Sequence, residues 1–401
     1  MKYAVLVGDG MSDRPLNELN DRTPLEVAKI PNMTEIVKEG SIGYSFTIPR
    51  GFTPASDVAN MAVLGYDPTV YYKGRGPLEA ANMDIKLSDD EIAFRCNLVT
   101  VADGRLIDYS AGHIRTKEAS ILVDALDKKL STKDVKFHSG VSYRHLVIIK
   151  KGTSGGGDFG AICFPPHDIV GQPVSKNLPR GEGAAVLIKF MESSVPVLAE
   201  HEVNKVRVDL KENPANMVWL WGQGTSPNMP PFFDKYSVKG SVISAVDLVN
   251  GIGKLVGLNV IKVPGVTGYY DTNYQGKGEY AVEALKESDF VFVHVEAPDE
   301  AGHNGDVRAK IAAIENFDKH IVGPVFKYLK GLKKWRLMVL PDHATPISIK
   351  THASDPIPVA FCGKDIAPDD AVVFSEKAAR ASKLSFEKGH KMMDYLINLE
   401  K

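Results

Sequence analysis

Short apolar runs rich in β-branched and aromatic residues alternate along the chain with longer amphipathic stretches. The first run, YAVLV at residues 3–7, ends in Gly-Asp-Gly, as a buried strand followed by a turn would. Similar runs occur at 219–222, 258–263, 290–296, 336–343 and 358–363. Amphipathic stretches occur at 242–256, 279–287, 307–331 and 388–400. This alternation predicts an α/β fold with a parallel-rich central sheet and helices on both of its faces.

The middle of the chain has a different pattern. Strands with a more mixed pattern of apolar and polar residues are predicted at 92–102, 134–138 and 144–150, and a helix is predicted at 116–130. Residues 152–183 are rich in Gly, Pro and Lys and predict loops. We therefore expect a discontinuous core of residues 1–86 and 186–401 and a smaller inserted α/β domain at 87–185. Because the insert lies between core segments, its two linkers suit a hinged, substrate-binding lid.

The amino-acid composition indicates a globular protein and argues against several kinds of partner and site. Of the 401 residues, 44% are hydrophobic, which is ordinary for a globular chain. The 48 Lys and Arg are balanced by 50 Asp and Glu, so no basic excess points to a nucleic-acid partner. Cys96, Cys163 and Cys362 lack Cys-x-x-Cys spacing, which favours a reducing compartment and excludes a thiol-based metal site. With neither a signal segment nor a membrane-length apolar run, we expect a cytoplasmic protein; its oligomeric state stays open.

Acids and histidines follow several of the predicted strands. They are Asp9, Asp299, His303, Asp342, His343 and, nine residues later, His352. Ligands of parallel sheets gather at the carboxyl ends of the strands, so we expect these side chains to converge. Carboxylates and imidazoles without thiols suit a pair of divalent ions, namely manganese, zinc or magnesium. The alternative is structural, because an Asp after a strand commonly forms a turn or caps a helix.

A serine provides a second candidate. Ser56 in TPASDVANMAVLG lies between a proline-containing turn and an apolar helical stretch, so its hydroxyl is expected near a helix N-terminus, where anions are favoured. It could be an N-cap with no further role. As a nucleophile it would need activation, and the chain has no Gly-x-Ser-x-Gly elbow. Coordination of the Ser56 hydroxyl to a metal ion is the means of activation that remains.

Several cations could bind the anionic parts of a substrate. The candidates are Lys73, Arg75, Arg95, His113, Arg144 and Lys277. Arginine suits two-point capture of a carboxylate or phosphate. Each of these cations taken singly is more often a solvated surface residue than a ligand. Arg95 and Arg144 are favoured because both adjoin predicted strands of the inserted domain.

Together these segments resemble the alkaline-phosphatase-like superfamily and, within it, the cofactor-independent phosphoglycerate mutases, especially their short archaeal form. The resemblance runs over essentially the whole chain. Its most specific segments are VHVEAPDEAGHNGD and LPDHATP, and others include VLVGDGMSDRP, TPASDVANMAVLGYDP, YKGRGPLEA, AFRCNL, PPHDI, WLWGQG, GSVISAVDLVNGIG and VPGVTGYYDTNY.

The resemblance implies an isomerase of glycolysis and gluconeogenesis that interconverts 2- and 3-phosphoglycerate through a phosphoserine, without 2,3-bisphosphoglycerate. Ser56 would be the nucleophile. One metal would be held by Asp9, Ser56, Asp342 and His343, and the other by Asp299, His303 and His352. Manganese is the first expectation, with magnesium, zinc or cobalt as alternatives. The substrate would contact His113, Arg144, Arg95 and Lys277.

Two other functions remain open from the residues. A metal-dependent phosphatase, or a phosphotransferase similar to phosphopentomutase, would share the same core and nucleophile. A catalytically silent metal-binding protein would keep the ligands without turnover, although the intact set of seven ligand candidates argues against it.

Overall fold

The computed structural model describes residues 1–400, which form two compact units. The first comprises Met1–Tyr72 and the chain from Met229 onward, and the second comprises Lys73–Asn228. The second unit is therefore wider than the predicted insert of 87–185. The difference arises because α5 and β7, which flank that insert in sequence, both pack on strand β3 of the second sheet.

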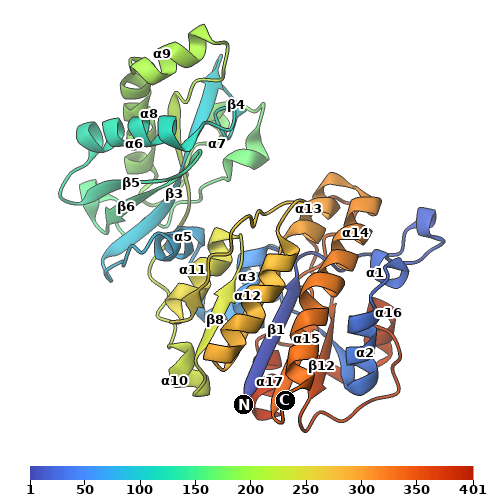
Figure 1. The fold of residues 1–401 in the computed structure, drawn as a ribbon. Helices are drawn as coiled ribbons and strands as arrows, with labels where there is room; N and C mark the ends of the chain where they lie inside the picture. The colour runs from blue at the N-terminus through green and yellow to red at the C-terminus, as the bar shows by residue number, and fades with distance from the viewer. Residues whose placement is uncertain (401) are drawn as a thin grey trace. The chain divides into compact units, whose positions relative to one another are not determined.

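The first unit is built on one eight-stranded mixed sheet (Figure 1). The spatial order is β13-β2-β12-β11-β1-β10-β8-β9. Only β12 runs antiparallel to its neighbours, so the parallel-rich sheet predicted from sequence is confirmed. The strands are β1 (Lys2–Gly8), β2 (Ser41–Ser45), β8 (Gly240–Ile243), β9 (Asn259–Val260), β10 (Phe290–Val295), β11 (Trp335–Leu340), β12 (Ile357–Gly363) and β13 (Leu384–Phe386).

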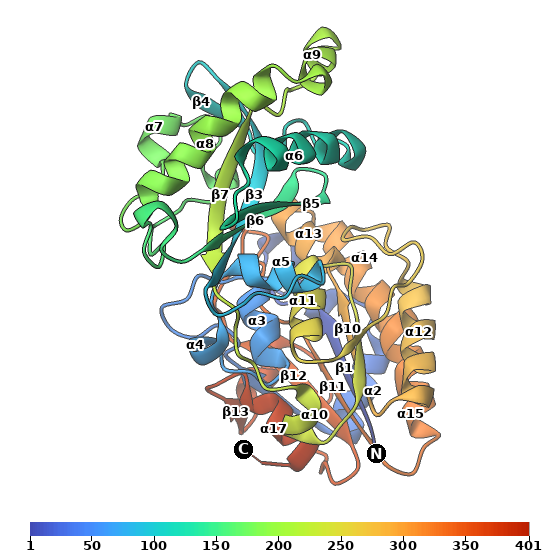
Figure 2. The ribbon, with the colours of Figure 1, turned by 90° about the vertical axis from the view of Figure 1, so that its left-hand side faces the viewer.

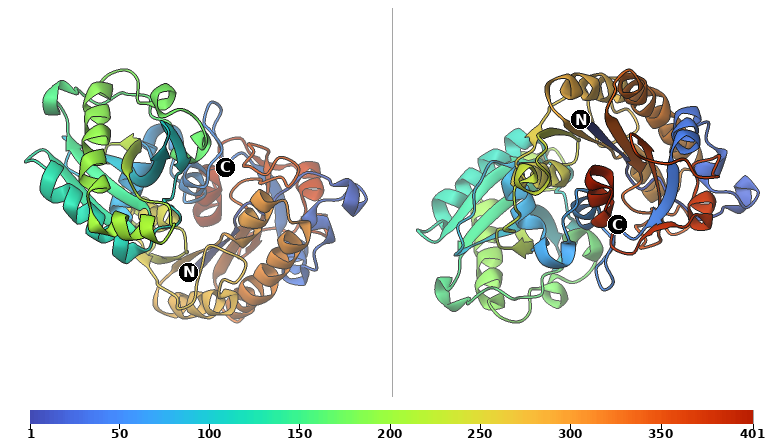
Figure 3. Two further views of the ribbon diagram at one scale, coloured as in Figure 1. Left: turned by 90° about the horizontal axis from the view of Figure 1, so that it is seen from above. Right: turned by 90° about the horizontal axis from the view of Figure 1, so that it is seen from below.

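Helices cover both faces of this sheet. Helices α12, α14 and α15 line one side, as the gold and orange ribbons in Figure 3 show. Ala4 and Leu6 of β1 pack into the hydrophobic core on that side, and the alternating Val5 and Val7 are equally buried. The helices of the unit are α1 (Pro24–Val27), α2 (Pro31–Glu39), α3 (Ser56–Val63), α4 (Pro68–Tyr71), α10 (Phe232–Tyr236), α11 (Asp247–Leu255), α12 (Tyr274–Glu287), α13 (Ala297–Asn304), α14 (Val307–Phe317), α15 (Gly323–Lys330), α16 (Glu376–Ala381) and α17 (Lys391–Asn398).

The second unit contains a five-stranded antiparallel sheet with helices α6 and α8 packed against each other and against β5 and β7 (Figure 2). The helix predicted at 116–130 is present with those bounds as α6. The predicted loop region 152–183 contains only short helical turns. The elements are β3 (Glu91–Ala102), β4 (Arg105–Asp108), β5 (Val135–Val141), β6 (Arg144–Lys150), β7 (Met217–Gly224), α5 (Arg75–Asn82), α6 (Thr116–Leu130), α7 (Val174–Asn177), α8 (Ala184–Ala199) and α9 (Glu202–Asp209).

Three assignments from sequence were wrong. The run at 219–222 lies in β7 and pairs with β3 of the second sheet, not with the core sheet. The stretch 242–256 is not one helix, because its first residues complete β8 before α11 begins. The run at 258–263 contributes only the two residues of β9. An apolar run indicates burial, but pairing partners far along the chain decide which sheet it joins and how far it stays extended.

Across residues 1–400, none of the helices combines the length and apolar character needed to cross a membrane.

Candidate active site

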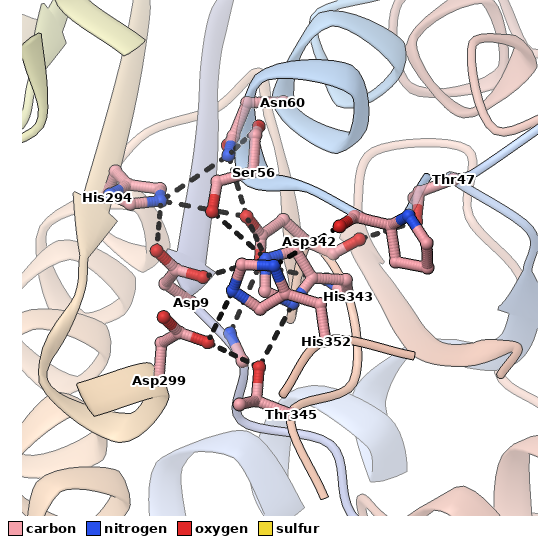
Figure 4. A network of polar contacts seen from close by, with 12 residues as sticks. Asp9, Thr47, Ser56, Asn60, His294, Asp299, Asp342, His343, Thr345 and His352 are labelled. Atoms are coloured by element: carbon pink, nitrogen blue, oxygen red, sulfur yellow. Dashed lines mark hydrogen bonds and ion pairs between the residues drawn. The ribbon is translucent and has the colours of Figure 1, made fainter. Parts of the chain in front are cut away.

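Three adjacent parallel strands deliver the candidate ligands to one edge of the first unit's sheet. Val7 of β1 is paired with Leu340 of β11 on one side and with His294 of β10 on the other. Asp9 follows β1, while Asp342 and His343 follow β11. Asp299 lies in α13, directly after β10. The convergence expected from sequence is therefore present, and Figure 4 shows these side chains pointing toward one another.

The first group of side chains surrounds the Nε2 atom of His343. Ser56 is the first residue of α3, and its Oγ lies 3.1 Å from this nitrogen. The nitrogen is also 3.4 Å from Asp9 Oδ1 and 3.7 Å from Asp342 Oδ2. One ligand atom from each of Asp9, Asp342 and His343 falls within 4.8 Å of the others, and all three residues are buried. Four donors from three segments of the chain thus face one small volume.

The second group forms around the carboxylate of Asp299. Its Oδ2 lies 3.1 Å from Nε2 of His303, one helical turn further along α13, and its Oδ1 lies 3.4 Å from Nε2 of His352. The two Nε2 atoms are 3.0 Å apart. The Nδ1 atom of His303 lies 3.1 Å from the carbonyl oxygen of Lys350, and the Nδ1 atom of His352 lies 3.3 Å from that of Pro54. Since a carbonyl only accepts, each Nδ1 carries a proton. The hydrogen bond to Asp299 raises the pKa of His303 to about 9, so a cation bound here would replace the proton on its Nε2.

The electrostatics of the site favour a bound cation. Burial raises the pKa of Asp9, and the neighbouring carboxylates of Asp342 and Asp299 raise it further. Burial acts in the same direction on Asp342 and Asp299, but nearby histidines outweigh it and hold both pKa values below their usual range. Asp9 Oδ1 is buried and accepts no hydrogen bond. A crowded carboxylate with an unsatisfied oxygen is what a divalent ion would stabilise, so these residues fit a metal centre.

Burial also lowers the pKa of His343, against the opposing effect of Asp342. The ring is fully buried. A neutral imidazole is the form that binds a metal, so the environment of His343 keeps it competent as a ligand.

Four residues that the sequence did not single out support this site. Asn60, one turn after Ser56 on α3, donates from Nδ2 to the Ser56 carbonyl (2.8 Å) and to Asp342 Oδ2 (2.7 Å). The Thr345 hydroxyl donates to Asp299 Oδ1 and lies 3.2 Å from His343 Nδ1. The Gly10 amide donates to Asp342 Oδ1 at 3.1 Å, and the fourth residue is His294. The only signals in the sequence were a histidine inside an apolar strand and an asparagine four residues after the serine.

His294 lies behind the first group of ligands. Its Nε2 is 3.2 Å from Asp9 Oδ2 and 3.8 Å from Asp342 Oδ2, and its Nδ1 is 3.3 Å from the Ser244 hydroxyl. The side chain is fully buried. With Nε2 protonated, it donates to Asp9 while Nδ1 accepts from Ser244, an arrangement that orients the Asp9 carboxylate.

Lys277 does not occupy the position expected of a substrate contact. It is fully buried in α12, and its ammonium donates to the carbonyl of His294 at 2.8 Å. Burial lowers the pKa of this lysine to about 8. The side chain therefore braces strand β10 beneath the site instead of facing open space.

The other predicted substrate contacts belong to the second unit and lie along a set of aromatic rings. The guanidinium of Arg95 is 4.5 Å from the Trp221 ring centroid, and its Nε is 3.0 Å from Glu79 Oε1. The Arg144 guanidinium lies 5.6 Å from the Tyr143 ring, and the His113 ring also packs on Tyr143, with ring centroids 6.2 Å apart. Burial lowers the pKa of Arg95, and the charges of Arg75 and Arg144 act in the same direction. Several cations are thus gathered near one carboxylate.

His167, in the PPHDI segment, completes this aromatic set. Its ring centroid is 5.3 Å from that of Trp221 and 6.1 Å from that of Tyr109, and Tyr109 in turn lies 5.6 Å from Tyr143. His167 is not among the functional residues predicted from sequence, because nothing in the spacing links it to Arg95 or Arg144.

Comparison with known proteins identifies the family. The family model for 2,3-bisphosphoglycerate-independent phosphoglycerate mutase matches residues 37–204. The mutase of Methanosarcina acetivorans is 49% identical over 100% of both chains, and that of Methanothrix thermoacetophila is 50% identical over 99% of this chain and 100% of the relative. The chain belongs to the 2,3-bisphosphoglycerate-independent phosphoglycerate mutases. The family resemblance seen in the sequence is confirmed.

Solved structures agree with this assignment. A protein from Pyrococcus horikoshii superimposes with a TM-score of 0.83 at 30% identity, covering 100% of this chain and 98% of that one. The cofactor-independent phosphoglycerate mutase from Thermoplasma acidophilum superimposes with a TM-score of 0.68 at 29% identity, covering 100% of both chains. The α/β fold with two units is therefore that of the family along its whole length.

Replacing His294 with alanine is expected to weaken binding of Mn²⁺ by about 10–100-fold, because Asp9 loses the donor that orients it. Isothermal titration calorimetry with Mn²⁺ measures the effect. His320→Ala, which removes a partly exposed imidazole from the same unit, serves as the matched control. Unchanged Mn²⁺ affinity in His294→Ala would show that this ring does not support the ligand.

Proposed function

We propose that this chain is an isomerase that interconverts 2-phosphoglycerate and 3-phosphoglycerate through a phosphoserine at Ser56, without 2,3-bisphosphoglycerate. One observation carries the proposal: in a chain of the mutase family, the Ser56 hydroxyl at the start of α3 lies 3.1 Å from His343 within a converging set of carboxylates and imidazoles. Metal coordination would activate the serine in these surroundings, with His343 as a ligand of the same ion and not as the general base.

The converging side chains would hold two divalent ions. Asp9, Ser56, Asp342 and His343 suit one ion, and Asp299, His303 and His352 suit the other; the proximity of His343 to both groups supports a close pair. Oxygen and imidazole donors without thiolates admit Mn²⁺, which we favour, and also Mg²⁺, Zn²⁺ or Co²⁺. When bound, the two ions would neutralise charge on the phosphoryl oxygens and increase the nucleophilicity of the serine.

The chain's own residues position the transferred group. Asn60 ties the first turn of α3 to Asp342, so the Ser56 hydroxyl is held in one place relative to the carboxylates. The N-terminus of α3 adds partial positive charge where the phosphoryl group would lie. Ser56 Oγ forms a bond to phosphorus as the bond to the glycerate oxygen breaks. The other glycerate hydroxyl then attacks phosphorus and releases the serine.

The second unit would hold the glycerate. Arg95, Arg144 and His113 are the residues we assign to the carboxylate and phosphate of the substrate. The support is the charge imbalance around Arg95, whose guanidinium is buried, paired with Glu79 and exposed to the like charges of two other arginines. An anionic ligand would relieve that repulsion, and retaining the glycerate between the two transfers is what a mutase needs and a phosphatase does not.

Ser56→Ala is expected to abolish mutase turnover because no acceptor for the phosphoryl group remains. Circular dichroism should show the wild-type fold. With Mn²⁺ in excess, Asp9, Asp342 and His343 should still hold their ion without the serine, so elemental analysis should show a metal content close to wild type. Ser385→Ala, which removes an exposed hydroxyl from β13, should leave turnover unchanged. Near-normal turnover by Ser56→Ala would refute the nucleophile assignment.

Removal of divalent ions by chelation is expected to abolish turnover, since buried, mutually repelling carboxylates are left uncompensated. Adding Mn²⁺ back should restore activity, with two ions bound per chain at saturation. A coupled mutase assay measures the recovered activity, and elemental analysis counts the ions bound per chain. Parallel additions of Mg²⁺, Zn²⁺ and Co²⁺ show which metal restores the most activity. Full activity in protein shown to be metal-free would contradict the dinuclear centre.

Arg144→Gln is expected to lower kcat/KM for 3-phosphoglycerate by about 10–100-fold, because a hydrogen bond to a charged group is worth about 1.5–3 kcal/mol. Steady-state kinetics in the mutase direction measure the change. Arg105→Gln, at an exposed position of β4 in the same unit, should behave as wild type. If the two variants have equal kcat/KM, Arg144 does not bind the substrate.

A further inference from the structure

A buried lysine that belongs to neither predicted ligand group lies close behind the site. Lys310, on α14, has no exposed surface. Its ammonium donates to Asp13 Oδ2 at 2.7 Å, to the Thr345 carbonyl at 2.8 Å and to the Ser12 carbonyl at 3.3 Å. A buried ammonium is tolerated when its donors are satisfied in this way, and here the partners come from two different loops.

These two loops carry candidate ligands of the metal centre. Ser12 and Asp13 follow Asp9 in the loop after β1, and Thr345 follows Asp342 and His343 in the loop after β11. The loops are also joined directly, since the Thr345 amide donates to the Ser12 carbonyl at 3.2 Å. Lys310 therefore adds a charged link between two segments whose separation sets the geometry of the first ligand group.

Asp13 strengthens the same link from the other side. Its carboxylate accepts from the Ile347 amide, at 3.3 Å and 3.2 Å to its two oxygens, while pairing with Lys310. Glu376 of α16 accepts from the Asp13 amide at 3.0 Å and from the Ser12 hydroxyl at 3.2 Å, which fixes the backbone of the loop. The loop after β1 is thus anchored to α14, to α16 and to the loop after β11.

The loops after β1 and β11 are packed so tightly against the candidate ligands that a shift of either loop would move the ligands too. Gly10 has a φ of +58°, and a Cβ there would lie 2.5 Å from both Asp299 Oδ1 and Thr345 Oγ1. The Thr345 hydroxyl in turn donates to Asp299 and lies 3.2 Å from His343 Nδ1. Because no space separates the loops from Asp299 and His343, a change in loop separation would move the ligand atoms.

We propose that Lys310 and Asp13 are positioning residues for the metal centre: their buried ion pair fixes the separation of the loops after β1 and β11, and metal affinity depends on it. The inference rests on the metal centre described under the proposed function. The hydrogen bonds of Lys310 go to Ser12, Asp13 and Thr345 and not to a candidate ligand atom, so the pair acts through Thr345 and the loop backbone, beside the attraction between the charges of Lys310 and Asp299.

The test compares Lys310→Met, Asp13→Asn and the double variant with wild type, measuring Mn²⁺ affinity by calorimetry and thermal unfolding of the metal-free protein. Each single variant should unfold at a lower temperature, because one buried charge loses its partner. The double variant should recover much of this stability, since neither charge remains. Its Mn²⁺ affinity should nevertheless stay lower than wild type by about 10–100-fold, as for other residues that orient metal ligands. If the ion pair were purely structural, the double variant would recover both the unfolding temperature and the Mn²⁺ affinity of the wild type.

Lys330→Met is the matched control, because it removes an exposed lysine that pairs with Glu35 and Glu39 on the surface. It should bind Mn²⁺ as wild type does. If Lys310→Met does not fold, the Mn²⁺ affinity of the double variant by itself decides whether the ion pair positions the metal ligands. Wild-type Mn²⁺ affinity in the double variant overturns the positioning role, whereas failure of the wild-type protein itself to bind Mn²⁺ overturns the proposed metal centre.

Discussion

The repulsion among three buried carboxylates is the constraint on which the rest of the site depends. Asp9, Asp299 and Asp342 meet at one edge of the sheet because β1, β10 and β11 are adjacent and parallel. Like charges this close, removed from water, are costly unless cations or donors compensate them. The surrounding histidines, Asn60 and Thr345 supply part of that compensation, and divalent ions would supply the remainder. The chemistry we propose uses this same unbalanced charge.

Holding the carboxylates together requires rigid support that extends beyond the ligands. Lys277 fixes the backbone of β10 from behind, and Lys310 joins the loops after β1 and β11. Both lysines are fully buried, which is uncommon for this residue type without specific partners. Each bonds to backbone carbonyls, so each restrains main-chain position in the first unit. The site therefore owes its geometry to side chains from α12 and α14 that the proposed chemistry does not use.

The two units carry complementary chemistry. The first gathers anionic ligands and the nucleophile, and the second gathers arginines and histidines along aromatic rings. A phosphoglycerate carries both a phosphoryl group and a carboxylate, which are anionic groups of the kinds that metal ions and guanidiniums bind. This division of charge suits a reaction in which the phosphoryl group changes position while the glycerate is retained.

The sequence by itself determined the family, the α/β class, the helix at 116–130 and the convergence of Asp9, Ser56, Asp299, Asp342 and His343. The fold class and the carboxylates and His343 follow from local signals, because strand runs and the residues that end them are contiguous in the chain. The family and Ser56 follow from the motifs that carry the resemblance. Only the tertiary structure decided that the 219–222 strand belongs to the second sheet, that Lys277 is buried, and that His294, Asn60, Thr345 and Lys310 support the site. These depend on contacts between residues tens to hundreds of positions apart, and no pattern within a short window of sequence records such contacts.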